Sequence, residues 1–347
     1  MATNRTSNKE ITGLEQNVCV QGDDGLTETD RVGKILAGDI REAAKLIRDI
    51  DDDMPSSKEV LKALYPHTGN AYIIGISGFP GVGKSTLVDQ MVSAYRDKGK
   101  TVGVLAVDPT SPFTGGAILG DRVRMQRHGT DSGVFIRSMA TRGHFGGLTR
   151  STRGAIDVLD AMGKDVIIIE TVGVGQDEID IVNTAHTTII VLIPGMGDDI
   201  QAIKAGILEV ADIFVVNKAD REGAERTVQD LNTMLELEKH TVSKRYWRPP
   251  IVLTTAVMGK GTEELLSRID EHRKFLFADP RSDLTNRYRE KAYRGLIDTI
   301  KDGLFREIIN DLKASSSLDK MIDDLVQKKV DPFTLSEQII ARKLKRS

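Results

Sequence analysis

The chain contains 347 residues, enough for about two domains with sizeable cores. Lys and Arg number 48 against 51 Asp and Glu, so the net charge is -3 and no basic excess exists to neutralise the phosphates of a nucleic acid. No apolar run approaches the ~20 residues of a membrane-spanning helix. Cys19 is the only cysteine, which excludes a disulfide framework and a Cys-built metal site. We therefore expect a cytoplasmic protein that binds neither nucleic acid nor membranes.

The N-terminal part begins with a polar stretch and then carries helix signals. Residues 1–27 predict a flexible tail. Within residues 28–70, Asp39-x-x-Glu42 forms a capping box that starts a helix, and Ser56 repeats the cap signal before a further apolar stripe. We expect an N-terminal helical region there.

From residue 71 the pattern changes to short apolar runs rich in β-branched residues. The runs are continuous rather than alternating, which is typical of a parallel sheet covered on both faces. Helix-compatible stretches separate most of them, so residues 71–278 predict a doubly wound, mostly parallel α/β domain. The runs are 71–77, 101–108, 133–139, 165–171, 187–193, 211–217 and 250–255.

Beyond the last run the pattern becomes helical again. Apolar residues recur every four or eight positions from Leu284 to Leu312, as in a long amphipathic helix. Thr334-x-x-Glu337 predicts the cap of a last helix. Residues 279–347 therefore form a helical arm, whose apolar face packs either on its own sheet domain or against a second copy of the chain.

The strongest local signal is the segment Gly78–Ser85, which reads GFPGVGKS and matches G-x4-G-K-[ST] completely. Its glycines let backbone N–H groups curve around phosphate oxygens, and the following helix adds the positive end of its dipole. Lys84 can reach the β- and γ-phosphates, and the Ser85 hydroxyl can ligate Mg²⁺. The segment predicts a nucleoside-triphosphate site.

A second motif concerns the base of the nucleotide. Asn217-Lys218-Ala219-Asp220 follows an apolar strand, and the Asp220 carboxylate can accept hydrogen bonds from N1–H and the 2-amino group of guanine. Adenine lacks both donors, so the motif favours GTP over ATP. Asn217 can brace the loop, and the Lys218 stem can lie across the base. We assign the second base-contacting loop to Thr255, Ala256 and Val257.

Acidic residues end two of the predicted strands, where open α/β sheets place ligand groups. Glu170 belongs beside the metal, directly or through water, although most GTPases carry Asp there, and Gly173 can offer its N–H to the γ-phosphate. Asp108 ends a neighbouring strand and opens a Gly-rich first switch that contains Asp121. As alternatives, Asp108 could cap a turn and Asp121 could form a surface salt bridge.

The water-positioning Gln of Ras-type enzymes is replaced here by Val174, which cannot orient water. We therefore expect slow intrinsic hydrolysis, with a catalytic group supplied by rearrangement or by a partner. The candidates within the chain are Lys204, Arg122 and Arg142, although such residues are more often solvated charges than catalytic groups.

Taken together, the motifs resemble the methylmalonyl-CoA mutase-associated GTPases of the MeaB/ArgK/MMAA type, within the wider group of metal- and cofactor-delivery GTPases. The similarity runs from about residue 30 to the C-terminus. The strings that carry it are GISGFPGVGKST, VLAVDPTSPFTGGAILGDRVRM, IIIETVGVGQDE, VLIPGMGDDIQAIKAGILEVAD and VNKAD.

This resemblance implies a P-loop NTPase fold and a GTP-hydrolysing chaperone of a B12-dependent acyl-CoA mutase. Such proteins gate adenosylcobalamin loading and help eject damaged cofactor. The family is typically homodimeric through a C-terminal helical arm.

Carried onto this chain, the catalytic residues are Lys84, Glu170 and Lys204, the last linked to partner-stimulated hydrolysis. The GTP/GDP-binding residues are Gly78, Phe79, Pro80, Gly81, Val82, Gly83, Lys84, Ser85, Thr86, Gly173, Asn217, Lys218, Asp220, Thr255, Ala256 and Val257. The Mg²⁺ residues are Ser85, Asp108, Asp121 and Glu170.

Two other readings of the same motifs remain. A nickel- or cobalt-delivery GTPase would share the fold, but such proteins usually carry His-rich tracts or Cys motifs, and this chain has one Cys. A small-molecule kinase would use the same phosphate loop, but the guanine motif and the missing acceptor-binding segment count against it. The sequence leaves open which acyl-CoA mutase is the client.

Overall fold

The computed structural model divides after Arg273 into two compact units, which are described separately. No helix in the described ranges is both long and apolar enough to cross a membrane. The structure describes residues 26–108, 125–140, 150–171, 184–195, 211–237, 247–278, 283–315 and 317–344.

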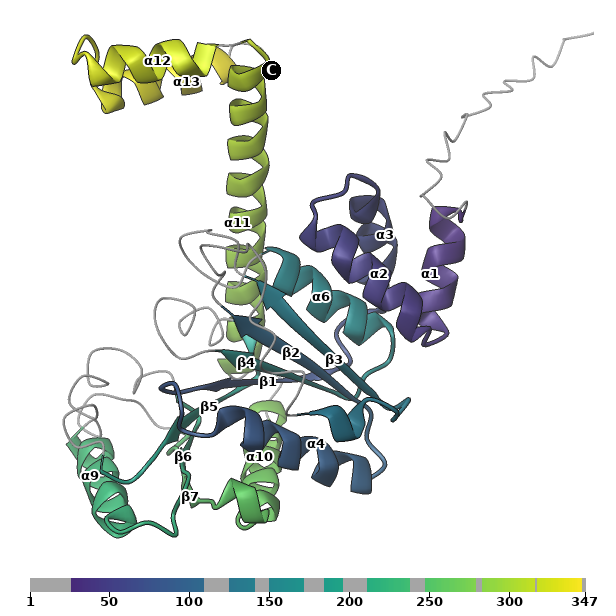
Figure 1. The fold of residues 1–347 in the computed structure, drawn as a ribbon, viewed down its shortest axis with the longest axis vertical. Coiled ribbons are helices and arrows are strands. Elements are labelled where there is room, and N and C mark those ends of the chain that lie inside the picture. Colours follow the sequence, from purple (N-terminus) through teal and green to yellow (C-terminus); the bar gives the residue numbers. More distant parts are fainter. Residues whose placement is uncertain are drawn as a thin grey trace, which may run out of the picture. The chain divides into compact units, whose positions relative to one another are not determined.

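The first unit is built on a seven-stranded sheet in the order β3-β2-β4-β1-β5-β6-β7, in which every pairing is parallel (Figure 1). This confirms the doubly wound α/β prediction. The strands are β1 (Tyr72–Ser77), β2 (Val102–Asp108), β3 (Val134–Ala140), β4 (Val166–Thr171), β5 (Thr187–Leu192), β6 (Ile213–Val216) and β7 (Ile251–Leu253). The helices are α1 (Glu28–Leu36), α2 (Ile40–Asp51), α3 (Ser56–Leu64), α4 (Lys84–Asp97), α6 (Arg150–Ala161), α9 (Ala224–Leu237) and α10 (Thr262–Phe277).

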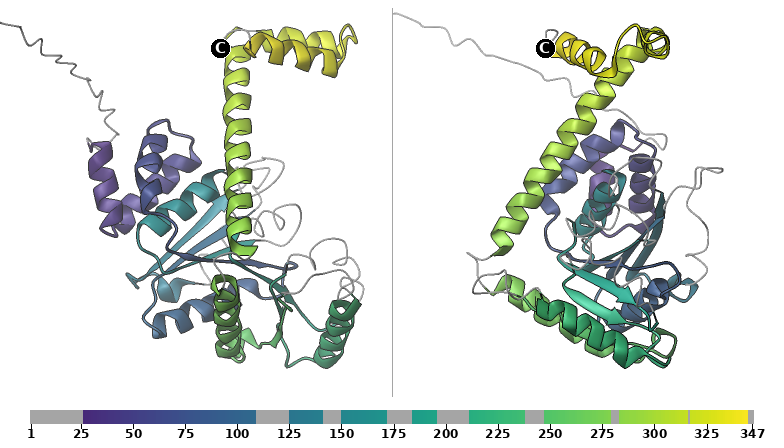
Figure 2. Two further views of the ribbon diagram at one scale, coloured as in Figure 1. Left: turned by 180° about the vertical axis from the view of Figure 1, so that it is seen from behind. Right: turned by 90° about the vertical axis from the view of Figure 1, so that its left-hand side faces the viewer.

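Helices cover both faces of the sheet, which explains the continuous apolar runs. Successive side chains of a strand point to opposite faces. Val104 of β2 and Ile168 of β4 join the core beneath α4 and α10, whereas their neighbours Leu105 and Ile169 join the core beneath α1, α2, α3 and α6. Figure 2 shows these two layers from behind. Because both faces of these strands are covered, most of their positions are apolar, and β4 reads VIIIET.

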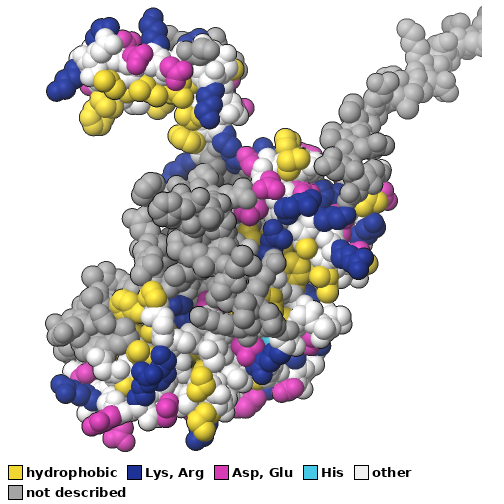
Figure 3. Space-filling model, in the orientation of Figure 1, with side chains coloured by type: hydrophobic (Ala, Val, Ile, Leu, Met, Phe, Trp, Pro, Cys, Tyr) yellow, Lys and Arg dark blue, Asp and Glu magenta, His cyan; other side chains and the backbone are white. Residues whose placement is uncertain are grey.

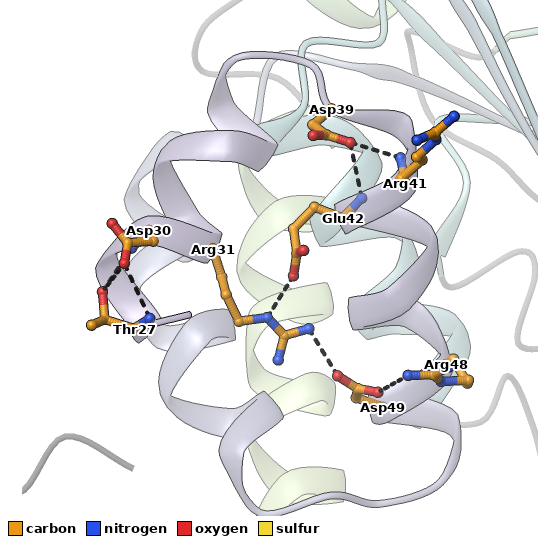
Figure 4. Close-up of polar contacts among 8 residues, drawn as sticks. All are labelled: Thr27, Asp30, Arg31, Asp39, Arg41, Glu42, Arg48 and Asp49. Atoms are coloured by element: carbon orange, nitrogen blue, oxygen red, sulfur yellow. Dashed lines mark hydrogen bonds and ion pairs between the residues drawn. The ribbon is translucent and has the colours of Figure 1, made fainter. Parts of the chain in front are cut away.

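The N-terminal helices are joined by a buried ion network (Figure 4). Arg31 of α1 donates from Nε to Glu42 Oε1 at 2.6 Å and from Nη2 to Asp49 Oδ2 at 2.8 Å, both on α2. Asp39 caps α2 by accepting from the backbone N–H groups of Arg41 and Glu42. Half of the predicted capping box is therefore present, while Glu42 binds Arg31.

Two other predicted caps are wrong by a few residues. Pro55 precedes α3 and makes no side-chain cap, while Ser56 is already its first residue. Before the last helix, Asp331 accepts from the backbone N–H and the hydroxyl of Thr334, so Asp331 is the capping residue. A Ser or Thr inside the first turn gives nearly the same sequence pattern as one at the cap.

The second unit begins within the last turn of α10 and continues with α11 (Asp283–Ala314), α12 (Ser317–Val326) and α13 (Pro332–Leu344). Lys343 of α13 binds Asp311 and Glu307 of α11 at 3.0 and 3.1 Å. Within the described parts of these three helices, Leu312 is the only buried hydrophobic residue. The long helix was predicted, and among its described residues Tyr293, Leu296, Ile300, Leu304 and Phe305 are exposed.

Candidate nucleotide-binding site

The loop between β1 and α4 has a backbone that only glycine tolerates at two positions. Gly78 has a φ of 144°, and a Cβ there would collide with the carbonyl oxygen of Val191 in β5. Gly83 has a φ of 96°, and its Cβ would lie 2.5 Å from the Asn217 side-chain amide. The loop is therefore held close to β5 and to the segment after β6.

Lys84 is the first residue of α4, and its side chain folds back over the loop. Its Nζ donates to the carbonyl oxygens of Gly78 at 2.6 Å and Phe79 at 3.0 Å. The side chain is buried, so a cation lies within the curve of the loop at the N-terminus of a 14-residue helix. Helix dipole and ammonium together favour an anion at this position.

Ser85 and Glu170 meet although they come from different elements. Ser85 Oγ, in the first turn of α4, donates to Glu170 Oε1 at 2.6 Å, and both side chains are buried. Glu170 lies in β4 directly beside Ile76 of β1. A hydroxyl and a carboxylate are the oxygen ligands that Mg²⁺ prefers, so the donor set fits this cation.

Asn217 joins three segments of the site. Its Nδ2 donates to the carbonyl oxygen of Val82 at 2.8 Å, and its Oδ1 accepts from Thr254 Oγ1 at 3.1 Å and from the Ala256 backbone N–H at 3.0 Å. Asn217 is 2% exposed. These hydrogen bonds of Asn217 link the phosphate loop to the segment at Thr254 and Ala256. Thr254 was not among the predicted residues. The only sequence signal for it is its position directly before the second base loop.

Lys218 makes a second link between the base loop and the phosphate loop. It has a positive φ of 55°, and its Nζ donates to the Gly81 carbonyl oxygen at 2.8 Å. Asp220, two residues on, is exposed. In the other base loop Thr255 is buried, whereas Val257 is 78% exposed.

The remaining predicted residues are placed only in part or lie outside the described residues. Pro80 is exposed and Thr86 is half-buried in the first turn of α4. Asp108 is the last residue of β2, which pairs with β4, and its side chain is outside the described part. The predicted residues outside the described ranges are Asp121, Arg122, Arg142, Gly173, Val174 and Lys204.

The chain is similar to known proteins over most of its length. A model of the family described as "Methylmalonyl Co-A mutase-associated GTPase MeaB" matches residues 43–313. A putative GTPase of Pyrococcus abyssi is 50% identical over 309 residues, which are 89% of this chain and 94% of that protein. The mitochondrial methylmalonic aciduria type A homolog of Caenorhabditis elegans is 31% identical over 77% of this chain and 67% of that protein.

A solved structure described as a LAO/AO transport system kinase superposes with a TM-score of 0.65 at 23% identity, covering 92% of this chain and 98% of that chain. At this identity the likeness concerns the fold. Fold, phosphate loop and relatives define a P-loop GTPase, which binds guanine nucleotide and hydrolyses GTP to GDP and phosphate. The chain belongs to the family of methylmalonyl-CoA mutase-associated GTPases, which confirms the resemblance.

Proposed function

We propose that this chain is a GTP-hydrolysing chaperone of a coenzyme B12-dependent acyl-CoA mutase. In this role it acts in the cytoplasm, gates adenosylcobalamin loading, and protects or reactivates the mutase. The observation that carries the proposal is the family match over residues 43–313, because it spans the phosphate loop, both base loops and most of α11.

In this proposal the phosphate loop binds the triphosphate through its backbone N–H groups. Lys84 exchanges the carbonyls of Gly78 and Phe79 for β- and γ-phosphate oxygens, forming charge-assisted hydrogen bonds. The base lies against Lys218, with Asp220 accepting from its N1–H and 2-amino groups and the Thr255–Val257 loop on its other side.

Ser85 and Glu170 would hold Mg²⁺, with Asp108 and Asp121 completing the set of ligands. When bound, Mg²⁺ neutralises charge that develops on the phosphate oxygens. The Ser85 oxygen, which lies 2.6 Å from Glu170 Oε1, would be a ligand of this ion. Hydrolysis by the chain alone is slow because Val174 cannot orient water, and the mutase stimulates it through the segment that contains Lys204.

We also propose a homodimer formed through α11, α12 and α13. On α11 the exposed apolar residues Tyr293, Leu296, Ile300 and Leu304 are spaced by three or four positions, so they follow one helix face. An apolar stripe of this length is costly to leave in water, and a second copy would bury it.

The test is GTP turnover by the purified protein, alone and with a B12-dependent acyl-CoA mutase titrated in. Slow turnover that rises steeply with mutase, together with GTP-dependent transfer of adenosylcobalamin followed by its absorbance, is expected. A Lys84→Ala variant controls for contaminating phosphatases. Fast turnover that ignores the mutase would reject the mutase as the client while leaving the GTPase activity intact.

A further inference from the structure

β3 is an edge strand of the sheet, and two strands, β2 and β4, separate it from β1, which leads into the phosphate loop. β3 contains seven residues and neither Pro nor Gly, whereas the strand at the opposite margin, β7, has only three residues. Within the described part of the chain, no strand pairs with the outer side of β3. Natural proteins usually shorten, charge or cover such an edge, because its backbone groups invite another strand.

The register identifies which backbone groups face outward. The Val102 N–H donates to the Gly133 carbonyl oxygen at 2.9 Å, and β2 and β3 run parallel from there. In a parallel ladder alternate residues bond to the same neighbour, so Phe135 and Arg137 face β2. Ile136 and Ser138 therefore direct both their N–H and C=O groups away from the sheet.

A groove of about 440 Å³ lies along this margin, within the size range of ligand pockets. Its lining comes from three segments, namely Ile40 and Ala44 of α2, residues 134–137 of β3, and residues 128–132. The groove thus combines apolar walls with a row of backbone donors and acceptors, which is what an extended peptide requires.

The charges at the groove favour an acidic ligand. Arg137 Nη1 donates to the Ala44 carbonyl oxygen at 3.1 Å, which places the guanidinium between β3 and α2. Arg41 and Lys45 follow on α2 four positions apart, and Arg48 of the same helix binds Asp49 at 3.3 Å. Figure 3 shows Lys and Arg side chains over the N-terminal helices, with Asp and Glu side chains among them.

The acidic side chains near the groove already have partners. Asp131, which lines it, binds Arg96 through two hydrogen bonds of 2.8 and 3.0 Å. Asp39 accepts from the backbone at the start of α2, and Asp49 binds Arg31. The charges of these carboxylates are therefore partly compensated, whereas the exposed Arg41 lies next to the apolar wall formed by Ile40.

We propose that this groove binds an extended, acidic peptide segment of a partner protein, which adds to the sheet as a strand beside β3. The peptide backbone pairs with Ile136 and Ser138. Its acidic side chains, on alternate positions, lie toward Arg137 and Arg41. The groove is separate from the nucleotide site. The proposal does not depend on which mutase is the client.

The probe is a short fluorescein-labelled peptide in which Glu alternates with Val, titrated with the full-length protein at low salt and read by fluorescence anisotropy. Two matched peptides serve as controls. One carries Lys in place of every Glu, and the other is N-methylated at alternate amides so that one backbone edge cannot pair. Saturable binding of the acidic peptide, at least about tenfold tighter than that of either control, is expected.

Two substitutions locate the peptide on the protein. Ile136→Pro removes an outward N–H without touching the ladder to β2, as edge strands tolerate. Arg41→Glu reverses the charge at the groove wall. Each should weaken binding about fivefold or more, whereas Lys58→Glu, the same charge change on an exposed position of α3, should not. Unchanged circular dichroism spectra and GTP turnover would show that each variant is folded.

Three results would overturn the proposal. They are no saturable binding of the acidic peptide, equal binding of the Lys or N-methylated peptide, or unchanged affinity in a folded Arg41→Glu variant.

Discussion

Lys84 satisfies its ammonium group with two carbonyl oxygens of its own loop, at 2.6 and 3.0 Å from Gly78 and Phe79. The phosphate loop is thus held in a curved form by the residue that is expected to bind the phosphates. Glycine at positions 78 and 83 is required by the close approach of β5 and Asn217. The site is therefore preorganised, and nucleotide has to displace hydrogen bonds rather than build the loop.

We expect Lys84→Ala to lower GTP affinity by about 100-fold or more, because charge-assisted hydrogen bonds to two phosphates are lost. Titration of a fluorescent GTP analogue measures this. Lys100→Ala is the matched control, since Lys100 is exposed and binds Asp165 elsewhere in the same unit. If a folded Lys84→Ala variant kept its GTP affinity, the assignment of the phosphate loop would be wrong.

Asn217→Ala is expected to destabilise the protein by about 3 kcal/mol, because it leaves buried polar groups of Val82, Thr254 and Ala256 without a partner. Urea unfolding measures the loss. Asn70→Ala, at an exposed position where Nδ2 donates to the His67 carbonyl oxygen at 3.2 Å, should cost less than about 1 kcal/mol. Equal losses in the two variants would show that Asn217 does not hold the loops together.

Helix α6 carries a carboxyl group, that of Asp157, at a position where burial disfavours its charged form. Burial raises the pKa of Asp157 from 3.8 to about 7, and the charge of Asp160 adds to the rise while Arg153 opposes it. Asp160 itself is used structurally, because it accepts from the backbone N–H groups of Gly69, Asn70 and Ala71. The helix therefore carries two carboxyl groups one turn apart, of which one binds the chain that leads into β1.

A raised folded-state pKa means that the folded protein binds a proton more tightly than the unfolded chain does. Asp157 therefore contributes its full stabilisation below about pH 4, and this is lost as the pH rises to about 7. We expect the free energy of unfolding to fall by about 2–4 kcal/mol over that window for this group. Urea titrations at pH 5 and pH 8 measure it.

Asp157→Asn should flatten this pH dependence and make the variant more stable than the parent at pH 8. Asp230→Asn, at an exposed position of α9, is the control and should leave the profile unchanged. If both variants follow the parent between pH 5 and pH 8, then Asp157 is not the group responsible.

At the scale of the whole molecule, the two units differ in how much apolar surface they bury. The first unit has cores on both faces of its sheet, whereas the described parts of α11, α12 and α13 bury one hydrophobic residue, Leu312. Helices with so little burial gain little from folding alone. In the proposed dimer, a second copy of the chain would bury the exposed apolar side chains of this unit.

Ile300→Asp is expected to convert the proposed dimer to a monomer, because it places a charge in the middle of the apolar stripe of α11. Sedimentation equilibrium measures the mass. Lys301→Asp, on an exposed position one residue away, should leave the dimer intact. A wild-type protein that is monomeric at micromolar concentration would contradict the proposed dimer directly.

The strands, the phosphate loop and the family could be predicted because each depends on residues that are close in the chain. Continuous apolar runs indicated the strands, although the run at 250–255 became the three-residue strand Ile251–Leu253. The glycine pattern of the loop is local in the same way. Caps were predicted less accurately, since Ser56 and Thr334 lie inside the first turns rather than before them.

The contacts between these segments were decided only by the tertiary structure. Ser85 and Glu170 are 85 residues apart, and Asn217 meets Val82 across 135 residues. No spacing in the sequence encodes these pairs. They arise because helical crossovers make the strands parallel, so that the carboxyl ends of β1, β4, β5 and β6 meet at one edge of the sheet. The same topology leaves β3 at the margin, where its apolar sequence alone resembles that of any interior strand.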